Sequence, residues 1–323
     1  MKVLATGGAG YIGSHTCKSL AENGHEPVVF DNLSEGHRWA VKWGPLVVGD
    51  IADRALLATT MKAQAIEAVI HFAGSAYVGE SMQQPMKYFT NNTLGSMALL
   101  DAMMRVGVPR IVFSSSCVIY GLPARTPIDE THPTLPVSPY GESKLAVEKA
   151  LRWLGDLAGL RWIALRYFNA AGADPDGELG EVHDPETHLI PLTLRAAAPG
   201  DYHLQILGAD YPTRDGTAIR DYVHVTDLGR AHVFALAALE HDGVNDVVNL
   251  GTGCGASVLD VVAAVEKATG SRVRRDIAPR RAVDPAALVA DASKAGRLLS
   301  WAPQRSALET IVADAWAWHR KSS

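Results

Sequence analysis

The sequence predicts an α/β protein with a doubly wound parallel sheet and a smaller mixed α/β domain. The chain has 323 residues, enough for two domains of roughly 150 residues each. Apolar stretches of strand length alternate with helical patterns through its first half, which is typical of βαβ units. The first stretch runs directly into a glycine-rich turn that opens a helix. Because crossovers between parallel strands are right-handed, helices should cover both faces of the sheet.

Six apolar stretches are predicted as the strands of this sheet. They cover residues Lys2–Thr6, Pro27–Phe30, Leu46–Gly49, Ala68–Phe72, Arg110–Ser114 and Trp162–Arg166. Two of the helices between them are well marked. Gly13–Asn23 ends before Gly24, which stands where a left-handed residue closes a helix, and Asn92–Arg105 precedes the fifth strand.

The pattern becomes irregular in the second half of the chain, which indicates a second domain. Residues 170–187 are rich in Gly, Asp and Pro, as expected of a surface segment. Helical periodicity returns at Asp227–Leu239 and at Ser306–His319. The last of these helices is predicted to begin with a capping box formed by Ser306 and Glu309.

Composition and charge exclude several classes of protein. Hydrophobic residues make up 47% of the chain and charged residues 20%, so a disordered or collagen-like chain is excluded. The 30 basic and 35 acidic side chains give a net charge of −5. A general nucleic-acid binder needs a basic face, so we expect no nucleic-acid partner.

The cysteines and the start of the chain bear on its location. Cys17, Cys117 and Cys254 are far apart and form no CxxC pair, so neither a disulfide framework nor a zinc ribbon is expected. No apolar region typical of a signal peptide follows Met1, and no apolar run approaches the roughly 20 residues of a membrane span. We therefore expect a cytoplasmic protein without membrane contact.

The glycine-rich turn has the spacing and the context of a dinucleotide site. Gly7, Gly10 and Gly13 give GxxGxxG between a strand and a helix, where a pyrophosphate can approach the backbone at the helix N-terminus. Asp31 lies at the end of the next strand, where a carboxylate binds ribose hydroxyls and repels a 2′-phosphate. The sequence therefore predicts a Rossmann-type domain that binds NAD, with Asp50 after the third strand as an adenine contact.

A tyrosine and a lysine are predicted to lie one turn apart on a helix. Ser138 can cap this helix and Pro139 suits its first position, which places Tyr140 and Lys144 on one face. A phenol is a poor base at neutral pH, so we expect the lysine and a cationic nicotinamide to lower its pKa. Ser116, at the end of an earlier strand, can hold the same alcohol oxygen. This triad favours oxidation of an alcohol by hydride transfer.

Further motifs identify the chain as similar to a known family. It resembles the extended short-chain dehydrogenases/reductases over nearly its whole length, and specifically the UDP-glucose 4-epimerases. RYFN, DGTxxRDYxHV and PRR are particular to nucleotide-sugar 4-epimerases. The motifs that carry the resemblance are VLATGGAGYIGSHT, FDNLS, VVGDI, VIHFAG, SSSCVIYG, SPYGESK, LRYFN, DYPTRDGTAIRDYVHVTDL, NLGTG, and APRR followed by DASKA.

The resemblance implies roles for individual residues and a homodimeric isomerase. Tyr140 would be the base, Lys144 would tune it and bind the nicotinamide ribose, and Ser116 would contact the sugar oxygen. The residues implied to line the NAD site are Gly7, Gly10, Tyr11, Ile12, Gly13, Asp31, Asn32, Asp50, Ile51, Phe72, Ala73, Gly74, Asn91, Tyr140, Lys144 and Tyr167. Those implied to hold the UDP-sugar are Ser116, Tyr140, Asn169, His188, Leu189, Gln205, Leu207, Arg220, Tyr222, Arg281, Asp284 and Leu288.

The chain departs from the family pattern at five of its sites. One is the family's PRREGD segment, where Ala282 and Val283 stand between Arg281 and Asp284. Ala76 stands where many members have a lysine near the NAD phosphates, and Val118 replaces a threonine near the sugar. His188 replaces an amide at the diphosphate. Leu288 replaces a tyrosine that narrows the hexose pocket, so 2-acetamido sugars are hypothesised to fit.

The expected domains and reaction follow from these residues. An NAD-binding domain is predicted over residues 1–170, completed by segments within 220–250, with a mainly UDP-sugar-binding domain over 171–323. The expected reaction inverts C4 of a UDP-sugar, UDP-glucose or UDP-galactose, through a 4-keto intermediate. The alternatives are 4-epimerisation of UDP-N-acetylhexosamines or of UDP-xylose and UDP-arabinose, a nucleotide-sugar 4,6-dehydratase or decarboxylase, and a catalytically inactive NAD sensor.

Two further expectations concern metal and thiol chemistry. His183 and His188 lack ligand spacing and a clear third partner, so no metal site is expected. Cys117 follows Ser116 and is predicted to point to the opposite face of its strand, without a nucleophilic role.

Overall fold

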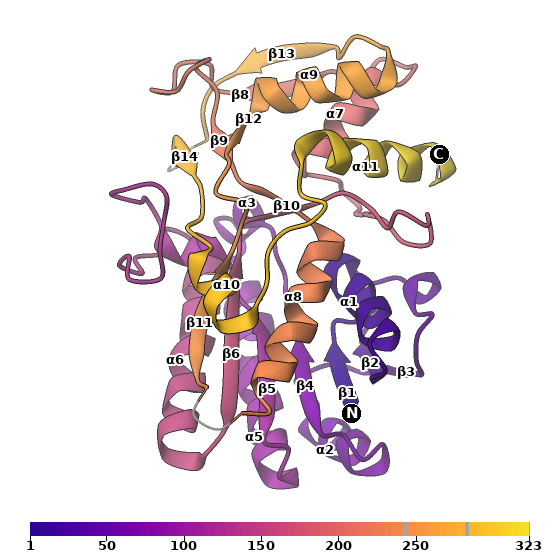
Figure 1. The fold of residues 1–323 in the computed structure, drawn as a ribbon, viewed down its shortest axis with the longest axis vertical. Helices are drawn as coiled ribbons and strands as arrows, with labels where there is room; N and C mark the ends of the chain where they lie inside the picture. The colour runs from indigo at the N-terminus through magenta and orange to yellow at the C-terminus, as the bar shows by residue number, and fades with distance from the viewer. Residues whose placement is uncertain (242–243, 282–283, 323) are drawn as a thin grey trace.

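The computed structural model describes residues 1–241, 244–281 and 284–322, and it has two lobes. The larger lobe is built on a sheet whose strands all run in one direction. The smaller lobe lies above the carboxyl ends of these strands (Figure 1). In open α/β sheets ligands bind at this end of the strands, so the space between the two lobes is where a site is expected.

The sheet of the larger lobe has seven parallel strands in the order β11-β6-β5-β4-β1-β2-β3. Strand β1 lies between β2 and β4, so the chain order reverses there. Each predicted strand is present, and each end differs by at most one residue. The strands are β1 (Lys2–Thr6), β2 (Glu26–Asp31), β3 (Leu46–Val48), β4 (Ala68–His71), β5 (Arg110–Ser114), β6 (Arg161–Tyr167) and β11 (Asp246–Leu250).

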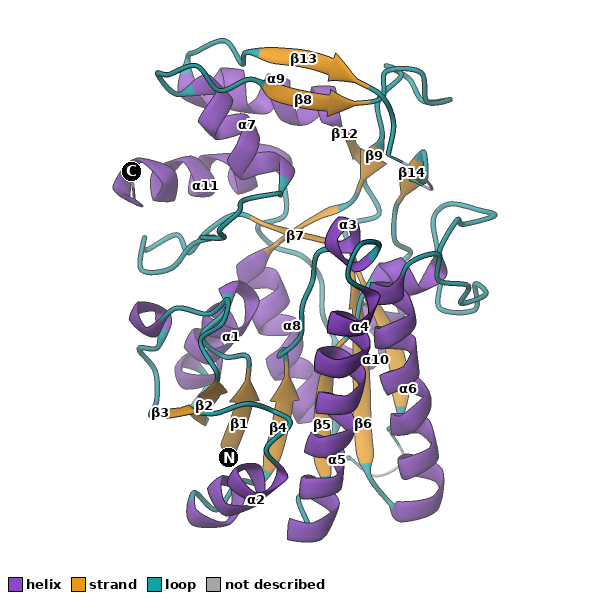
Figure 2. Ribbon diagram, turned by 180° about the vertical axis from the view of Figure 1, so that it is seen from behind, coloured by secondary structure: helices purple, strands orange, loops and turns teal. Residues whose placement is uncertain are grey.

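Helices cover both faces of the sheet, which confirms the predicted doubly wound α/β class. Alternate side chains of each strand point to opposite faces, so Val3 and Leu4 pack into different apolar clusters. One face is covered by α1 (Tyr11–Glu22), α8 (Val225–Ala238) and α10 (Ser293–Leu299). The other is covered by α2 (Arg54–Ala63), α5 (Gly95–Val106) and α6 (Pro139–Ala158), which lie in front of the sheet in Figure 2.

Short helices connect these elements near the carboxyl ends of the strands. The π-helical turn η2 follows directly on α4 and runs directly into α5, so the helix predicted at Asn92 begins seven residues earlier, at Pro85. The predicted strand position of Cys117 is wrong. Cys117 is the first residue of the 3-10 helix η3 and is buried in an apolar cluster. The short helices are η1 (Arg38–Ala40), α3 (Val78–Ser81), α4 (Pro85–Tyr88), η2 (Phe89–Leu94) and η3 (Cys117–Tyr120).

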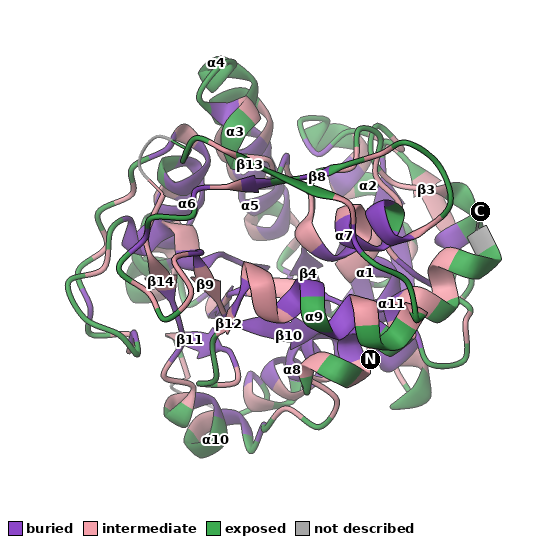
Figure 3. Cartoon of the chain, turned by 90° about the horizontal axis from the view of Figure 1, so that it is seen from above, coloured by how far each residue is buried: buried purple, intermediate pink, exposed green. Residues whose placement is uncertain are grey.

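The smaller lobe has three helices packed on one apolar cluster, together with three small groups of short strands. The helices are α7 (Leu189–Ala197), α9 (Val258–Thr269) and α11 (Leu308–Ser322). Strand β8 (Leu204–Leu207) pairs with β13 (Arg275–Ala278), and β7 (Asn169–Ala171) pairs with β10 (Tyr222–His224). Strand β9 (Ile219–Arg220) lies between β12 (Ala256–Ser257) and β14 (Ala287–Leu288). Seen from above, buried residues lie mainly toward the centre of the molecule, while exposed residues lie mainly on the outer helix faces and loops (Figure 3).

The predicted capping box at the last helix is wrong. Helix α11 begins at Leu308, and the Ser306 hydroxyl is used elsewhere. It donates to Asp227 (2.7 Å) and accepts a hydrogen bond from the backbone N–H of His224 (2.9 Å). Ser306 therefore fixes the chain before α11 to the start of α8. No helix of the described residues is long and apolar enough to cross a membrane.

Candidate active site

The glycine-rich turn after β1 is packed too closely for side chains at two of its three glycines. Gly7 has φ +72°, and a Cβ there would lie 2.5 Å from the backbone nitrogen of Ala73. A Cβ on Gly13 would lie 2.3 Å from the carbonyl oxygen of Gly7. At Gly10 the nearest atom would be 3.3 Å away, so this glycine keeps space open at the N-terminus of α1. In the described chain no side chain caps that terminus, which suits a diphosphate.

The carboxylate of Asp31 is held at the end of β2, beside the glycine turn. It accepts hydrogen bonds from the backbone N–H groups of Ala9 (3.0 Å) and Leu33 (2.8 Å), one on each oxygen. Burial raises its pKa. Each oxygen retains a second lone pair, so the group can accept from ribose hydroxyls. Asn32 donates to Asp50 (2.9 Å), so these two predicted residues lie together.

A second loop, after β4, places predicted cofactor residues against the catalytic helix. The N–H groups of Phe72 and Ala73 both donate to the carbonyl oxygen of Thr6, which joins this loop to the end of β1. A Cβ on Gly74, which has φ +155°, would lie 3.1 Å from Asn92 Oδ1 and 3.7 Å from Lys144 Nζ. Because Gly74 has no side chain, its backbone can lie close to the side chains of Asn92 and Lys144.

Asn92 is a residue that the sequence analysis missed. Its Oδ1 accepts from the N–H of Ser75 (2.8 Å), and its Nδ2 donates to Ser75 O (2.9 Å) and Ser143 Oγ (3.1 Å). The predicted residue Asn91 makes a weaker contact with Ser75 Oγ (3.2 Å). The π-helical turn η2, a feature often found at functional sites, contains both asparagines. Asn92 thus ties the loop after β4 to α6.

The predicted catalytic triad is assembled at the start of α6 and the end of β5. Ser138 caps α6 by accepting from the N–H of Gly141 (3.2 Å), which confirms the predicted helix start. Tyr140 and Lys144 are buried, and Lys144 Nζ lies 6.0 Å from the centre of the Tyr140 ring. The ammonium donates to the carbonyl oxygen of Ser114 (2.9 Å). Ser116 is buried, and its hydroxyl lies close enough to Tyr140 to act on the pKa of that phenol.

The predicted lowering of the Tyr140 pKa depends on Lys144 together with a cationic nicotinamide, and in the chain by itself burial dominates. Burial raises the pKa of Tyr140 well above its ordinary value, and the neighbouring Tyr167 adds to the rise. The Ser116 hydroxyl acts in the opposite direction, but its effect is smaller. Burial also lowers the pKa of Lys144 to about 8, against a smaller opposing effect of Glu148. Desolvation therefore disfavours the charged form of both groups, and a further positive charge is needed to ionise the phenol.

A buried ion pair between β6 and α6 holds the elements that carry this triad. Arg166 on β6 donates to both oxygens of Glu148 on α6 (3.0 and 2.6 Å), and Ser115 donates to the same carboxylate (2.6 Å). Arg166 also donates to the hydroxyl of Tyr120 (3.0 Å). These contacts join the end of β5 to α6, so they fix Ser116 relative to Tyr140. The sequence analysis did not single out this network.

Several predicted sugar-binding residues approach the triad from the smaller lobe. Arg220 on β9 is paired with Asp284 (2.6 Å), and Leu288 on β14 stands opposite Arg220 in the strand register. Leu288 is buried in one apolar cluster with Cys117, the neighbour of Ser116. Burial raises the pKa of Cys117 to about 12, and the charge of Arg220 partly opposes this. The two lobes therefore meet beside Cys117, the neighbour of the predicted catalytic residue Ser116.

The remaining predicted sugar-binding residues lie on elements around the same region. Tyr222 is paired with Asn169 across β10 and β7, and Tyr222 is buried. Leu189 is the first residue of α7, with His188 directly before it. Gln205 and Leu207 lie on β8, where the Gln205 amide donates to Asp276 (3.2 Å). Arg281 is exposed, and Ala282 and Val283 lie outside the described residues.

The expectation that His183 and His188 have no further ligand-type partner is wrong. Glu181 and Glu186 join them, and one potential ligand atom from each of the four side chains lies within 4.8 Å of the others. The signal in the sequence was present but weak, because the four residues stand in an irregular segment without a helical or strand period. The four side chains become neighbours only when this segment folds.

One protein-family model matches the region that contains the parallel sheet and the triad. The model described as the NAD dependent epimerase/dehydratase family matches residues 3–251. The chain belongs to the NAD dependent epimerase/dehydratase family. NAD is therefore the cofactor to be fitted to the site, and the glycine turn, the Asp31 carboxylate and the buried Lys144 suit its diphosphate and its two riboses.

Relatives within this family are similar over almost their whole length. A UDP-glucose 4-epimerase of Halalkalibacterium halodurans is 48% identical over 321 residues, which cover 99% of this chain and 96% of the relative. The UDP-glucose 4-epimerase of Brucella ovis, solved in complex with NAD, is 52% identical with a TM-score of 0.95, covering 98% of this chain and 97% of that chain. The UDP-glucose 4-epimerase of Stenotrophomonas maltophila, solved with NAD and formylated UDP-arabinopyranose, is 43% identical with a TM-score of 0.96, covering 100% of this chain and 98% of that chain. The predicted resemblance and fold class are confirmed.

Proposed function

We propose that this chain interconverts UDP-glucose and UDP-galactose as an NAD-dependent 4-epimerase, with Tyr140 as its acid–base residue. The observation that carries the assignment of roles is the buried contact of Tyr140 with Ser116, with Lys144 one turn behind. A 4-epimerase has to take a proton from the C4 hydroxyl and later return it. Tyr140 and Ser116 are the pair of hydroxyl groups placed to hold one alcohol oxygen.

The charges around Tyr140 support its role as a base. With a pKa of about 8, Lys144 keeps its proton at neutral pH and stabilises a phenolate at this site. When bound, NAD supplies a hydride acceptor for C4 and a positive charge on its nicotinamide. That charge opposes the desolvation that raises the pKa of Tyr140. Tyr140 then accepts the C4 proton, and it returns the proton when the 4-keto sugar is reduced on its other face.

The sugar has to turn over between the two steps, so the nucleotide half of the substrate should supply most of the binding. We assign the diphosphate to Arg220 and Arg281, because arginine binds such groups bidentately. Asn169, Leu189, Gln205, Leu207, Tyr222 and Asp284 are assigned to the nucleotide and Leu288 to the hexose. The larger lobe, residues 1–170 with segments within 220–250, is proposed to hold NAD, and residues 171–323 mainly the UDP-sugar.

A panel of UDP-sugars tests the proposed activity. Purified protein is incubated with UDP-glucose, UDP-galactose, their N-acetylated forms and UDP-xylose, and the products are identified by NMR. We expect conversion of UDP-glucose and UDP-galactose, and a drop of roughly 10²- to 10⁴-fold in turnover for Tyr140→Phe with NAD still bound. Tyr202→Phe on the smaller lobe is the matched control. Conversion of no UDP-hexose or UDP-pentose would refute the proposal.

We also propose that the protein is a cytoplasmic homodimer formed through α5 and α6. Large apolar side chains are exposed there, at Trp153 and Leu157 on α6 and at Leu94, just before α5. Exposed apolar groups on neighbouring helices are typical of an interface. The free thiols of the three cysteines are consistent with a reducing compartment. Light scattering should give the mass of a dimer for the wild type and of a monomer for Leu157→Glu.

A further inference from the structure

The segment between β7 and α7 carries four potential metal ligands, and the family resemblance gives only one of them, His188, a role at the diphosphate. We propose that Glu181, His183, Glu186 and His188, here called the Glu/His cluster, bind one divalent transition-metal ion, with Zn²⁺ the expected choice. One ligand atom from each residue lies within 4.8 Å of the other three. The site lies outside the triad of Ser116, Tyr140 and Lys144.

The distances within the cluster fit four ligands around one ion. His183 Nδ1 lies 3.3 Å from Glu181 Oε1 and 3.6 Å from Glu186 Oε2. His188 Nδ1 lies 2.7 Å from Glu181 Oε1 and 3.3 Å from Glu186 Oε1, so the two imidazoles face different oxygens of Glu186. Zinc binds such atoms at about 2.0–2.2 Å, so the ligands of a tetrahedral ion stand about 3.4 Å apart. Three of the four distances are close to this value, and the fourth is shorter.

The orientation of the imidazoles supports a shared ion rather than hydrogen bonds. In the described chain the Nδ1 atoms of His183 and His188 are buried, and neither makes a hydrogen bond of acceptable geometry. Both face the carboxylates, so two nitrogen lone pairs and two carboxylates converge on one point. A pair of imidazoles and a pair of carboxylates is a ligand set that zinc accepts.

Neighbouring groups hold the ligands in place. Glu186 accepts hydrogen bonds from the backbone N–H groups of Thr187 and His188, each at 2.7 Å. The rings of Tyr11 and Tyr77 meet His183 edge-on, with ring centres 6.3 and 6.0 Å away. Such supporting contacts orient metal ligands and shield the site from water.

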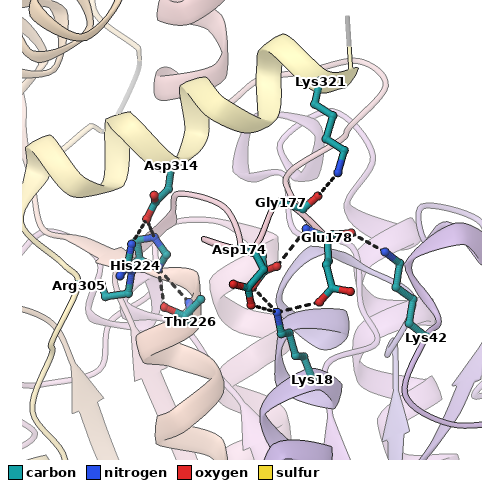
Figure 4. A network of polar contacts seen from close by, with 11 residues as sticks. Lys18, Lys42, Asp174, Gly177, Glu178, His224, Thr226, Arg305, Asp314 and Lys321 are labelled. Atoms are coloured by element: carbon teal, nitrogen blue, oxygen red, sulfur yellow. Dashed lines mark hydrogen bonds and ion pairs between the residues drawn. The ribbon is translucent and has the colours of Figure 1, made fainter.

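A neighbouring acidic cluster differs from the Glu/His cluster because a lysine already neutralises it. Asp174, Asp176 and Glu178 also lie within reach of one ion, but the ammonium of Lys18 already occupies their centre. Its Nζ lies 2.8, 2.7 and 2.9 Å from the three carboxylates, as Figure 4 shows for Asp174 and Glu178. Among the described residues, the side chains paired with the carboxylates of Glu181 and Glu186 are imidazoles alone. The Glu/His cluster therefore lacks the internal lysine that neutralises its neighbour.

The position of the cluster suggests a structural role for the ion. His188 directly precedes α7 and Leu189, and its ring lies 6.1 Å from that of Tyr77. Tyr11, beside His183, donates to Gly172 O (2.6 Å) and stands at the start of α1. A bound ion would fix the segment before α7 against the end of the glycine turn. We therefore assign the ion to positioning and not to the chemistry at C4.

Metal content tests this proposal on the full-length protein. The protein is stripped with a chelator, supplied with ZnCl₂ or CoCl₂, desalted and analysed by elemental mass spectrometry and calorimetry. We expect about one Zn²⁺ per chain and, with Co²⁺, the visible absorption of a tetrahedral nitrogen–oxygen site. His183→Ala and the isosteric Glu186→Gln should each weaken zinc binding by more than the roughly 10- to 100-fold lost with an outer-shell partner.

The control is Asp176→Asn, which alters the neighbouring acidic cluster and should leave the zinc content unchanged. Absence of zinc binding by the wild type, or a spectrum without tetrahedral bands, overturns the proposal whether or not the variants fold. Equal zinc binding by wild type, His183→Ala and Glu186→Gln overturns it as well. Because none of these readouts depends on turnover, they are independent of the proposed epimerase activity.

Discussion

The guanidinium of Arg220 and the carboxylate of Asp284 form an ion pair of 2.6 Å in the smaller lobe. The same carboxylate accepts a hydrogen bond from the hydroxyl of Tyr211 (3.0 Å). The pair is largely shielded from solvent, with 14% of the Arg220 side chain and 23% of the Asp284 side chain exposed. Arg220 is thus oriented next to Leu288 and the catalytic segment before a substrate arrives. Its charge is partly compensated, so the chain tolerates it without an anionic ligand.

Replacement of Arg220 should weaken binding of the nucleotide more than it slows the reaction. A charge-assisted hydrogen bond contributes about 1.5–3 kcal/mol, so Arg220→Ala should raise the inhibition constant of UDP roughly 10- to 100-fold. Inhibition by UDP and the separate kcat and KM of UDP-galactose measure this. Arg275→Ala, which removes an exposed arginine paired with Glu266, is the control. A loss confined to kcat would contradict the assignment of Arg220 to the diphosphate.

The three glycines of the turn after β1 should respond differently to alanine. At Gly7 a Cβ meets backbone atoms and the φ of +72° is strained for alanine, so Gly7→Ala should lower the free energy of unfolding by at least about 2 kcal/mol. Gly10 has an ordinary φ of −80° and more space. Gly10→Ala should stay within about 1 kcal/mol of the wild type.

Binding of NAD separates the two variants further. Because a methyl group on Gly10 would occupy the space at the N-terminus of α1, Gly10→Ala should bind NAD at least roughly tenfold more weakly, about 1.4 kcal/mol. Denaturant unfolding and NAD titration measure the two effects. If Gly10→Ala kept the NAD affinity of the wild type, the diphosphate would have to bind elsewhere.

Features set by local rules could be predicted from the sequence. The glycine turn, the start of α6 at Ser138 and the acid at the end of β2 each depend on neighbouring residues, and all three lie where expected. Strand ends were off by at most one residue. The family resemblance then supplied the roles of residues such as Arg220, which no spacing rule could have assigned.

Features that depend on tertiary contacts were missed or mistaken. Ser306 was assigned to a capping box, but its hydroxyl binds Asp227, 79 residues away. The Glu/His cluster forms in an irregular segment, where no periodicity reports proximity. The pKa of Tyr140 was expected to fall because of Lys144 and a cationic nicotinamide, and the opposing effect of burial in the chain by itself is not revealed by a single sequence.

The identity of Leu288 should influence which sugars the enzyme accepts. Leu288 is buried beside Cys117, one residue from the catalytic serine, and a larger side chain there would narrow the space around the sugar. Leu288→Tyr should therefore lower kcat/KM for UDP-N-acetylglucosamine by at least roughly tenfold while changing that for UDP-glucose less. Parallel assays of both substrates measure the ratio. Equal turnover of N-acetylated sugars by variant and wild type would remove Leu288 as a determinant of specificity.

Lys144 should make the protein less stable at neutral pH than at alkaline pH. Burial lowers its pKa from 10.5 to about 8 in the folded chain. Between about pH 8 and the unfolded value near ~10.4, the unfolded chain holds a proton that the folded chain has released. The unfolding free energy contributed by this group therefore rises with pH across that window. Below about pH 8 both states are protonated, and the folded chain bears the full cost of burying the ammonium.

Replacement of Lys144 by an uncharged side chain tests the sign of this effect. Lys144→Met should be more stable than the wild type at pH 7, by on the order of 2–3 kcal/mol at most, since one pKa unit corresponds to about 1.4 kcal/mol. The difference should shrink between pH 8 and pH 10, and turnover should be lost because the phenolate of Tyr140 loses its cation. Urea unfolding of both proteins at pH 7 and pH 9.5 measures this. A stability difference that stays constant with pH would mean that Lys144 does not titrate in this range. Its neighbours Phe113, Ser114 and Tyr140 would then stabilise the buried ammonium more than its low pKa indicates.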